Sequence, residues 1–188
     1  MPEPSHYPPF PADGYAARWS TWDGAHGELF TLAWENEAWT ATGRVGGADI
    51  EYVIRLSPLW QARQVLLFRD LDEPDLWLGT DGHGRWGEVN GAHRPELDGA
   101  VDVAFGVTPA LHVVPIRRLG LAVGHSVTLP VLTIDVDTLA VATVTHTYTR
   151  RAEHDWTVAV ADATEVGFTV DPHGLPLDVP GTFRRIEQ

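Results

Sequence analysis

Apolar and polar positions alternate in short runs along most of the chain. The runs rich in β-branched and aromatic residues span 27–34, 38–45, 50–56, 62–70, 131–136, 140–150, 156–161 and 164–170. Such alternation places successive side chains on opposite faces of a strand. Gly, Pro or Asp bounds nearly every run, as is typical of strands joined by turns. The pattern predicts a mainly β chain built from consecutive antiparallel strands.

Helical periodicity is weak throughout. Only residues 57–63, which open with Ser57 and Pro58, and part of 117–124 allow a helical turn. No internal repeat of fixed period stands out, which argues against a propeller or a solenoid. A mainly β chain must protect its sheet edges, and the usual solution is to close or curl the sheet. We therefore expect a curled sheet that encloses an interior.

The chain divides into a short arm and one domain. Residues 1–18 are rich in proline and predict an extended or disordered arm without chemistry. Residues 19–188 are expected to form a single domain, because a chain of 188 residues with 44% hydrophobic content can bury one sizeable core.

Charge and composition limit the partners. The formal net charge is −13, so clustered cations for nucleic acid or anionic membrane surfaces are not expected. The chain has no cysteine, which excludes disulfides, thiolate metal sites and a catalytic thiol. No window is apolar for the length of a membrane span, and the N-terminal residues do not resemble a secretory signal. We expect a cytoplasmic protein.

Motifs for catalysis or metal binding are weak. The stretch 124–128 begins like a nucleophile elbow around Ser126, but Thr128 stands where the final glycine belongs. The nine histidines show no spacing that would place two imidazoles on one metal. The acidic run 69–75 lacks the ligand spacing of a calcium loop. We expect neither a metal nor a cofactor.

Two adjacent arginines, Arg117 and Arg118, interrupt the apolar stretch 108–121. On a strand, neighbouring side chains point to opposite faces, so one arginine would point inward. An inward guanidinium needs carboxylates, carbonyls or a ligand. Pairing with Asp98 or Asp102 would satisfy it, and this answer is favoured because buried charges are usually paired.

The alternative is functional. One arginine, with His112 or Tyr148 nearby, would face a cavity and bind a polar headgroup, an acid or a phosphate. The eight tryptophans bear on this choice. Each taken singly is best explained by packing, but together they suit a pocket for amphiphiles or sugars, because indole rings combine apolar area with one N–H donor.

The order of motifs between 86 and 119, with 59–63, 146–151 and 170–185 around it, resembles a bacterial family of unknown function labelled putative glycolipid-binding. The matched positions are Trp60, Arg63, Trp86, Asn90, Asp98, Asp102, Thr108, Pro109, Pro115, Arg117 and Arg118. His112 stands where the family often has asparagine. The resemblance implies a spiral β-roll, a single curled antiparallel sheet similar to that of envelope lipoprotein carriers. The label rests on fold, which alone does not establish function.

Two main hypotheses follow, and the oligomeric state is left open. The first is a non-enzymatic binder of a glycolipid-like or other amphiphilic small molecule. The second is a small-metabolite enzyme with an arginine clamp, in which His112 or His146 reaches a cleft carboxylate as acid or base. A structural or oligomerisation module is the third possibility. The candidate ligand-binding residues are Arg117, Arg118, Trp60, Arg63, Trp86, Asp98, Asp102, His112 and Tyr148.

Overall fold

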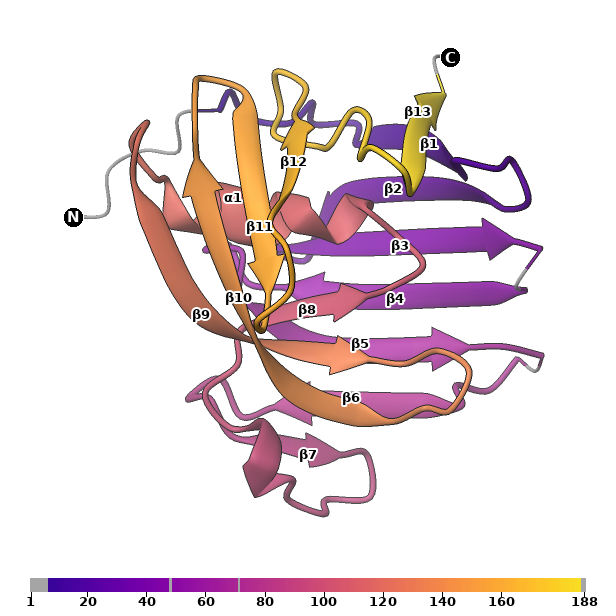
Figure 1. Cartoon of the computed structure of the whole chain (residues 1–188). Coiled ribbons are helices and arrows are strands. Elements are labelled where there is room, and N and C mark those ends of the chain that lie inside the picture. Colours follow the sequence, from indigo (N-terminus) through magenta and orange to yellow (C-terminus); the bar gives the residue numbers. More distant parts are fainter. Residues whose placement is uncertain (1–6, 48, 71, 187–188) are drawn as a thin grey trace.

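The computed structural model describes residues 7–47, 49–70 and 72–186 (Figure 1). The strands are β1 Tyr15–Thr21, β2 Gly27–Glu35, β3 Ala38–Gly46, β4 Ile50–Leu56, β5 Ala62–Phe68, β6 Leu76–Thr80, β7 Trp86–Glu88, β8 Asp102–Phe105, β9 Ser126–Ile134, β10 Val141–Arg150, β11 Asp155–Val160, β12 Val166–Thr169 and β13 Phe183–Ile186. The helices are the 3-10 helices η1 Pro95–Leu97 and η2 Ala110–His112, and the α-helix α1 Val113–Leu119. The predicted mainly β class is confirmed.

The arrangement is consistent with the expected β-roll, although the strands form a large sheet and a smaller, strongly curled sheet rather than one continuous sheet. The larger sheet has eight strands in the order β13-β1-β2-β3-β4-β5-β6-β7, and the smaller has five in the order β12-β11-β10-β9-β8. Figure 1 shows the smaller sheet crossing one face of the larger, with α1 between them. The meander stops at β7 because the next strand, β8, pairs in parallel with β9 in the second sheet.

That parallel pairing explains the helix. Parallel neighbours cannot be joined by a tight turn and need a crossover of a dozen or more residues. Residues 106–125 supply it, and α1 lies within them. The strand assumed for the arginine pair is therefore wrong, and the two arginines lie on α1. Pro115 is tolerated in the first turn of this helix, and Gly120, with φ of 54°, ends it in the left-handed conformation.

The turn expected at 57–63 is not helical. Ser57 oxygen Oγ accepts the backbone N–H groups of Leu59 and Gln61, and β5 begins at Ala62. Trp60 in this turn has φ of 62°, and its ring contacts those of Phe10 and Trp39, at 5.8 and 5.2 Å between centroids. The helical turn allowed within 117–124 coincides with the end of α1.

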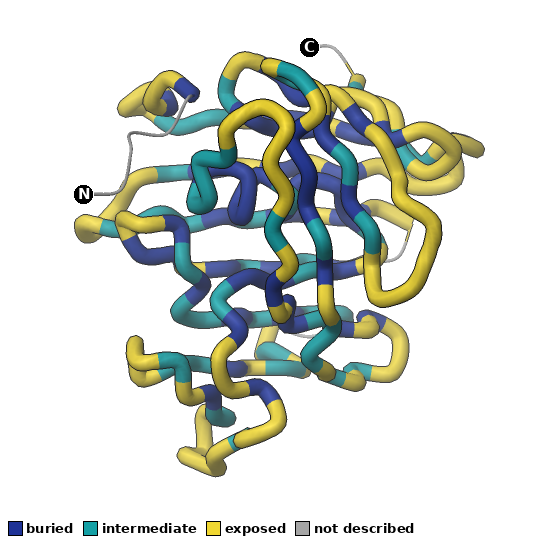
Figure 2. Tube along the Cα trace, turned by 60° about the vertical axis from the view of Figure 1, so that its left-hand side comes forward, coloured by how far each residue is buried: buried dark blue, intermediate teal, exposed yellow. Residues whose placement is uncertain are grey.

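The core lies between the two sheets. In β2 the side chains of Glu28, Phe30 and Leu32 are buried while Leu29 is exposed, as the period of two requires. Figure 2 shows the same pattern across the molecule, with buried residues along the strands and exposed residues at the turns.

The N-terminal segment lies against the domain. Residues 1–6 of the predicted arm lie outside the described residues, and β1 begins at Tyr15, inside the range assigned to the arm. Tyr7 and Phe10 are buried. The indole N–H of Trp156 donates to the Tyr7 hydroxyl at 2.8 Å. Two aromatic anchors thus order a proline-rich segment, since each buries a large apolar area.

Candidate ligand-binding site

An apolar cavity of about 260 Å³, which we call the interior pocket, lies between the inner face of the smaller sheet and the segment that leads into α1. Its wall includes Ala104, Phe105, Leu111, Val158, Val179 and Phe183. The exposed residues Val160, Val166 and Thr182 also line it and mark its mouth. The pocket is suited to apolar groups because most of this wall is aliphatic or aromatic.

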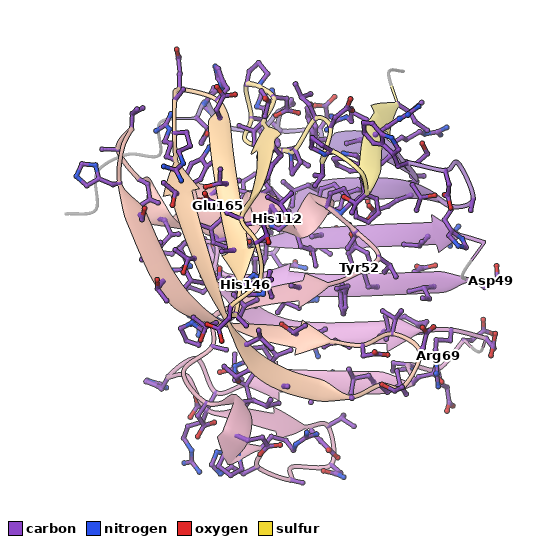
Figure 3. All side chains as sticks on the ribbon, viewed as in Figure 1. Asp49, Tyr52, Arg69, His112, His146 and Glu165 are labelled. Atoms are coloured by element: carbon purple, nitrogen blue, oxygen red, sulfur yellow. The ribbon has the colours of Figure 1, made fainter. Side chains whose placement is uncertain are left out.

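Three titratable side chains from two elements line the interior pocket, beside the hydroxyls of Thr108, Thr133 and Thr182. Figure 3 labels His112, which ends η2, and His146 of β10. Tyr148 lies two residues after His146 on the same face of β10 and also lines the pocket. The Tyr148 hydroxyl and His112 Nδ1 are hydrogen-bonded at 2.7 Å. The ring of Phe168 stacks on His112 with 5.1 Å between centroids. His112 is therefore held by a strand on one side and an aromatic ring on the other.

The interior pocket is electrically neutral at pH 7. Burial, reinforced by the neighbouring His146, lowers the pKa of His112 to about 4. Burial also lowers the pKa of His146 and raises that of Tyr148. All three groups are uncharged near neutrality, so the pocket favours a ligand that brings no charge into it.

A buried hydrogen-bond network lies behind the pocket. The hydroxyl of Tyr52 donates to Glu28 Oε1 at 2.5 Å, and that of Thr108 donates to the same carboxyl at 2.7 Å. Thr108 also accepts the N–H of Ala110 at 3.0 Å. The network joins β2 and β4 to the start of η2. Burial raises the pKa of Glu28 to about 7 although both hydroxyls lower it.

Sequence reasoning missed Glu28 and assigned His146 only to the enzyme hypothesis. Glu28 could have been found, because it shares the inward-facing register of Phe30 and Leu32 in a run that predicts a strand. The sequence contains nine histidines and does not show which of them lies on a strand face that lines the pocket, so His146 could not be identified as a ligand-binding residue.

Arg118 is paired with a carboxylate, as the favoured interpretation required. Its guanidinium makes a forked contact with Asp102, with 3.2 Å between Arg118 Nε and Asp102 Oδ1 and a second contact from Nη2 to Oδ2. Asp102 is fully buried in β8, and burial raises its pKa despite Arg118. The pair fixes α1 to the smaller sheet.

Arg117 contacts backbone carbonyls and aromatic rings, while its buried Nε has no hydrogen-bond partner among the described residues. Its Nη1 donates to the carbonyl oxygens of Pro8 at 3.0 Å and His173 at 2.9 Å. The guanidinium lies over the rings of Phe10, at 4.7 Å, and Trp60, at 5.0 Å. Burial lowers its pKa to about 10, so it stays charged at pH 7. Neither arginine lines the interior pocket.

The other predicted residues lie elsewhere. Trp86 donates its backbone N–H to Asp98 at 2.9 Å and its indole N–H to the Ala100 carbonyl at 2.8 Å. Asp98 also contacts His93 Nε2 at 2.9 Å, and Arg63 donates to Gln61 at 3.1 Å. Of the nine predicted ligand-binding residues, the interior pocket contains His112 and Tyr148.

The geometry that the enzyme hypothesis requires is not observed. Within residues 7–47, 49–70 and 72–186, neither His112 nor His146 forms a hydrogen bond or an ion pair with a carboxylate. His112 is bonded to a tyrosine instead. The described part of the chain also has no group of three or more His, Asp or Glu side chains placed to hold a metal ion.

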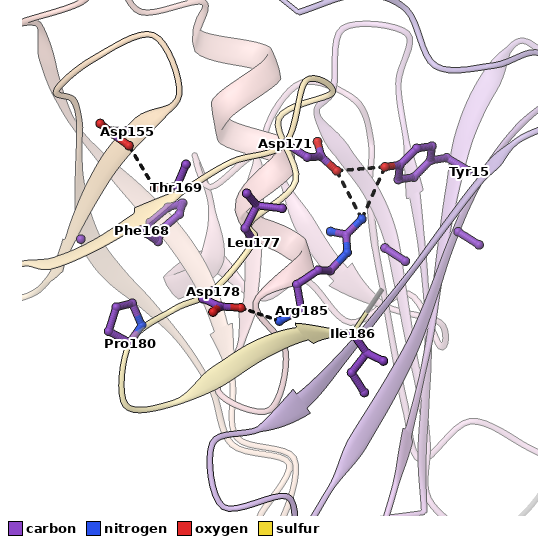
Figure 4. Close-up of a pocket in the computed structure, with 13 residues that line it drawn as sticks. Tyr15, Asp155, Phe168, Thr169, Asp171, Leu177, Asp178, Pro180, Arg185 and Ile186 are labelled. Carbon is purple, nitrogen blue, oxygen red and sulfur yellow. Dashed lines mark hydrogen bonds and ion pairs between the residues drawn. The ribbon is translucent and has the colours of Figure 1, made fainter. Parts of the chain in front are cut away.

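A second, wider hollow of about 1010 Å³, the outer cleft, lies between β12 and the β1–β13 edge of the larger sheet (Figure 4). Asp171 accepts the Tyr15 hydroxyl at 2.9 Å and Arg185 Nη2 at 3.3 Å. Asp171 and Arg185 thus pair with each other, whereas Asp155 accepts the Thr169 hydroxyl and Asp178 accepts the backbone N–H of Arg185. Residues 177–183 separate the two hollows, with Leu177 and Pro180 lining the cleft and Val179 and Phe183 lining the interior pocket.

Comparison with known proteins supports the fold and the family. The family profile described as "Putative glycolipid-binding" matches residues 16–185. The crystal structure of a DUF1089 family protein from Pseudomonas aeruginosa is similar with a TM-score of 0.69 and 24% sequence identity, over 94% of each chain. That likeness shows the fold. No curated protein sequence matches the chain.

Membrane-spanning helices are not found in the described residues. The helix α1 has seven residues and the two 3-10 helices have three each, so none is long enough to cross a bilayer.

The buried Arg118–Asp102 ion pair is expected to stabilise the fold. Arg118→Ala leaves the Asp102 carboxyl buried without its partner and is expected to lower the free energy of unfolding by roughly 3 kcal/mol in urea denaturation. The double variant Asp102→Leu/Arg118→Met removes both charges and should recover most of this loss. Arg44→Ala, which breaks the exposed Arg44–Glu51 pair, is the control and should cost little. Equal losses in the Arg118 and Arg44 variants would contradict the assignment.

The raised pKa of the buried Glu28 is expected to make the free energy of unfolding depend on pH. Because its pKa is about 7 in the folded protein against an ordinary 4.5, the folded state holds the proton more strongly than the unfolded chain. The contribution of Glu28 to the free energy of unfolding should therefore fall as pH rises from about 4.5 to 7, by on the order of 3 kcal/mol. The lowered pKa of His112 contributes with the opposite sign in both proteins, so the difference between wild type and Glu28→Gln isolates the Glu28 contribution.

The measurement is urea denaturation of the wild type and Glu28→Gln at pH 5, 6 and 7.5. The amide introduced by Glu28→Gln cannot ionise, so this variant should lack the fall. Glu35→Gln, at an exposed position of the same strand, is the control. Parallel pH profiles for wild type and Glu28→Gln would refute the interpretation.

Proposed function

Because the chain belongs to the putative glycolipid-binding family, we propose that it binds a small amphiphile whose apolar part occupies the interior pocket. The observation that carries the proposal is an apolar cavity on the inner face of the smaller sheet whose titratable groups, His112, His146 and Tyr148, are all uncharged near pH 7. Burial of apolar ligand surface in such a cavity supplies the binding free energy.

The volume of the pocket limits the ligand. A water-sized group occupies roughly 30 Å³ of liquid. A cavity of about 260 Å³ therefore holds a single chain or ring and is too small for two long acyl chains. The ligand class is a single-chain amphiphile.

The mouth of the pocket indicates where the head group lies. Val160 and Val166, each 38% exposed, stand at the mouth with Thr182, so a chain can enter between them and leave its head in solvent. The net charge of −13 repels anionic head groups, and the glycolipid-binding description of the family favours a sugar-like head among the others.

Binding without catalysis is part of this proposal. It is supported by the geometry of His112, which is bonded to Tyr148, and by the two arginines, which contact Asp102 and backbone carbonyls and do not line the interior pocket. The cytoplasmic location expected from the sequence stays a prediction.

The proposal predicts that octyl glucoside, below its micelle-forming concentration, binds one molecule per chain in isothermal titration calorimetry. Its heat capacity change should be negative, because apolar surface is buried. Ala104→Phe fills the pocket from β8, and Val160→Trp narrows its mouth. Each should weaken binding at least tenfold.

The control is Val89→Trp, which changes an exposed valine outside the interior pocket and should bind as the wild type does. Thermal unfolding of each variant establishes that the fold is retained. Unchanged affinity in both folded pocket variants, or no binding by the wild type, would overturn the proposed function.

A further inference from the structure

We propose that His146 recognises an uncharged hydroxyl group of the ligand at the neck of the interior pocket, an inference that rests on the proposed function. His146 is 3% exposed and lines the pocket. Neither Nδ1 nor Nε2 of its ring has a hydrogen-bond partner in the described part of the chain. A buried imidazole with two unsatisfied nitrogens is costly for the fold, so it indicates a partner that the protein itself does not supply.

The neighbouring polar groups are already engaged. His112 Nδ1 and the Tyr148 hydroxyl are bonded to each other, and Thr108 donates to Glu28. His146 therefore differs from the other polar side chains named in the pocket, since its whole hydrogen-bonding capacity is available to a ligand.

His146 lies where it can form a hydrogen bond with a ligand hydroxyl close to the head group of the ligand. Across the β10–β11 ladder, His146 stands opposite Val160 at the mouth, whereas Tyr148 stands opposite Val158, one inward-facing position further along. A chain that enters past Val160 meets His146 before the apolar wall of Val158 and Leu111. The hydroxyl would lie where the apolar chain joins the head.

The chemistry of the ring selects the group. A neutral imidazole offers one donor and one acceptor, and a hydroxyl can serve either nitrogen. A carboxylate only accepts, and it would need a cation to offset its burial. The nearest aromatic and titratable neighbours, His112 and Tyr148, are uncharged at pH 7, and Arg118 is held by Asp102. Burial also keeps His146 neutral, because it lowers the pKa.

The test compares 1-octanol with octanoate at pH 7.5 by titration calorimetry, with ring ¹⁵N chemical shifts of His146 as a second readout. The wild type should bind octanol at least tenfold more tightly than octanoate, and octanol should shift a His146 nitrogen resonance. His146→Phe fills a similar volume without the nitrogens and should bind octanol about tenfold more weakly. His146→Gln keeps a donor and an acceptor and should recover part of the affinity. His125→Phe, at an exposed turn outside the pocket, is the control and should bind as the wild type does.

The outcomes separate this inference from the proposed function. If a folded His146→Phe binds octanol as tightly as the wild type, or if octanoate binds equally well, His146 does not select a hydroxyl, while the binding function stands. If the wild type binds neither octanol nor octyl glucoside, the proposed function fails and this inference fails with it. Unchanged His146 resonances on octanol binding would also overturn the inference.

Discussion

The adjacent arginines of α1 make contacts in opposite directions, and the arrangement of the two sheets around the pocket depends on them. Arg118 is paired with Asp102 of the smaller sheet. Arg117 lies over the rings of Phe10 and Trp60 and donates to two backbone carbonyls. Because these contacts engage both arginines with segments outside the helix, they hold α1 in place. The helix in turn places His112, the residue just before it, beside Tyr148 of β10.

This arrangement changes the role assigned to the arginines. An arginine facing a cavity would have made the site an anion receptor. Both arginines instead stabilise the crossover, and the interior pocket presents neutral rings and aliphatic side chains. An arginine facing the pocket would favour an anionic ligand, whereas a neutral pocket favours an uncharged one. The proposed ligand is therefore an uncharged amphiphile. The chain shares its fold and family with the proteins that it resembles, but the proposed ligand follows from the side chains that line the pocket of this chain.

Much of the fold could be predicted from local patterns. The alternation in runs such as 27–34 and 38–45 predicts strands, and the acid–arginine pairing follows from the cost of burying a lone charge. The helix could not be predicted, because it follows from the parallel pairing of β8 with β9, a contact between distant segments. The site of Arg117 was hidden for the same reason, since its partners Pro8 and His173 are far apart in sequence. The pocket depends on how the smaller sheet crosses the larger one. The alternation of apolar and polar residues along a strand does not predict how two sheets pack against each other.

The most direct test of the account is to locate the bound chain by NMR. Intermolecular nuclear Overhauser effects would be measured between the alkyl protons of octyl glucoside and the methyl groups of the protein. The account predicts contacts with the methyl groups of Leu111, Val158 and Val179, which line the interior pocket. Contacts confined to Leu177 and Ile186 of the outer cleft, or none with the interior methyl groups, would contradict it.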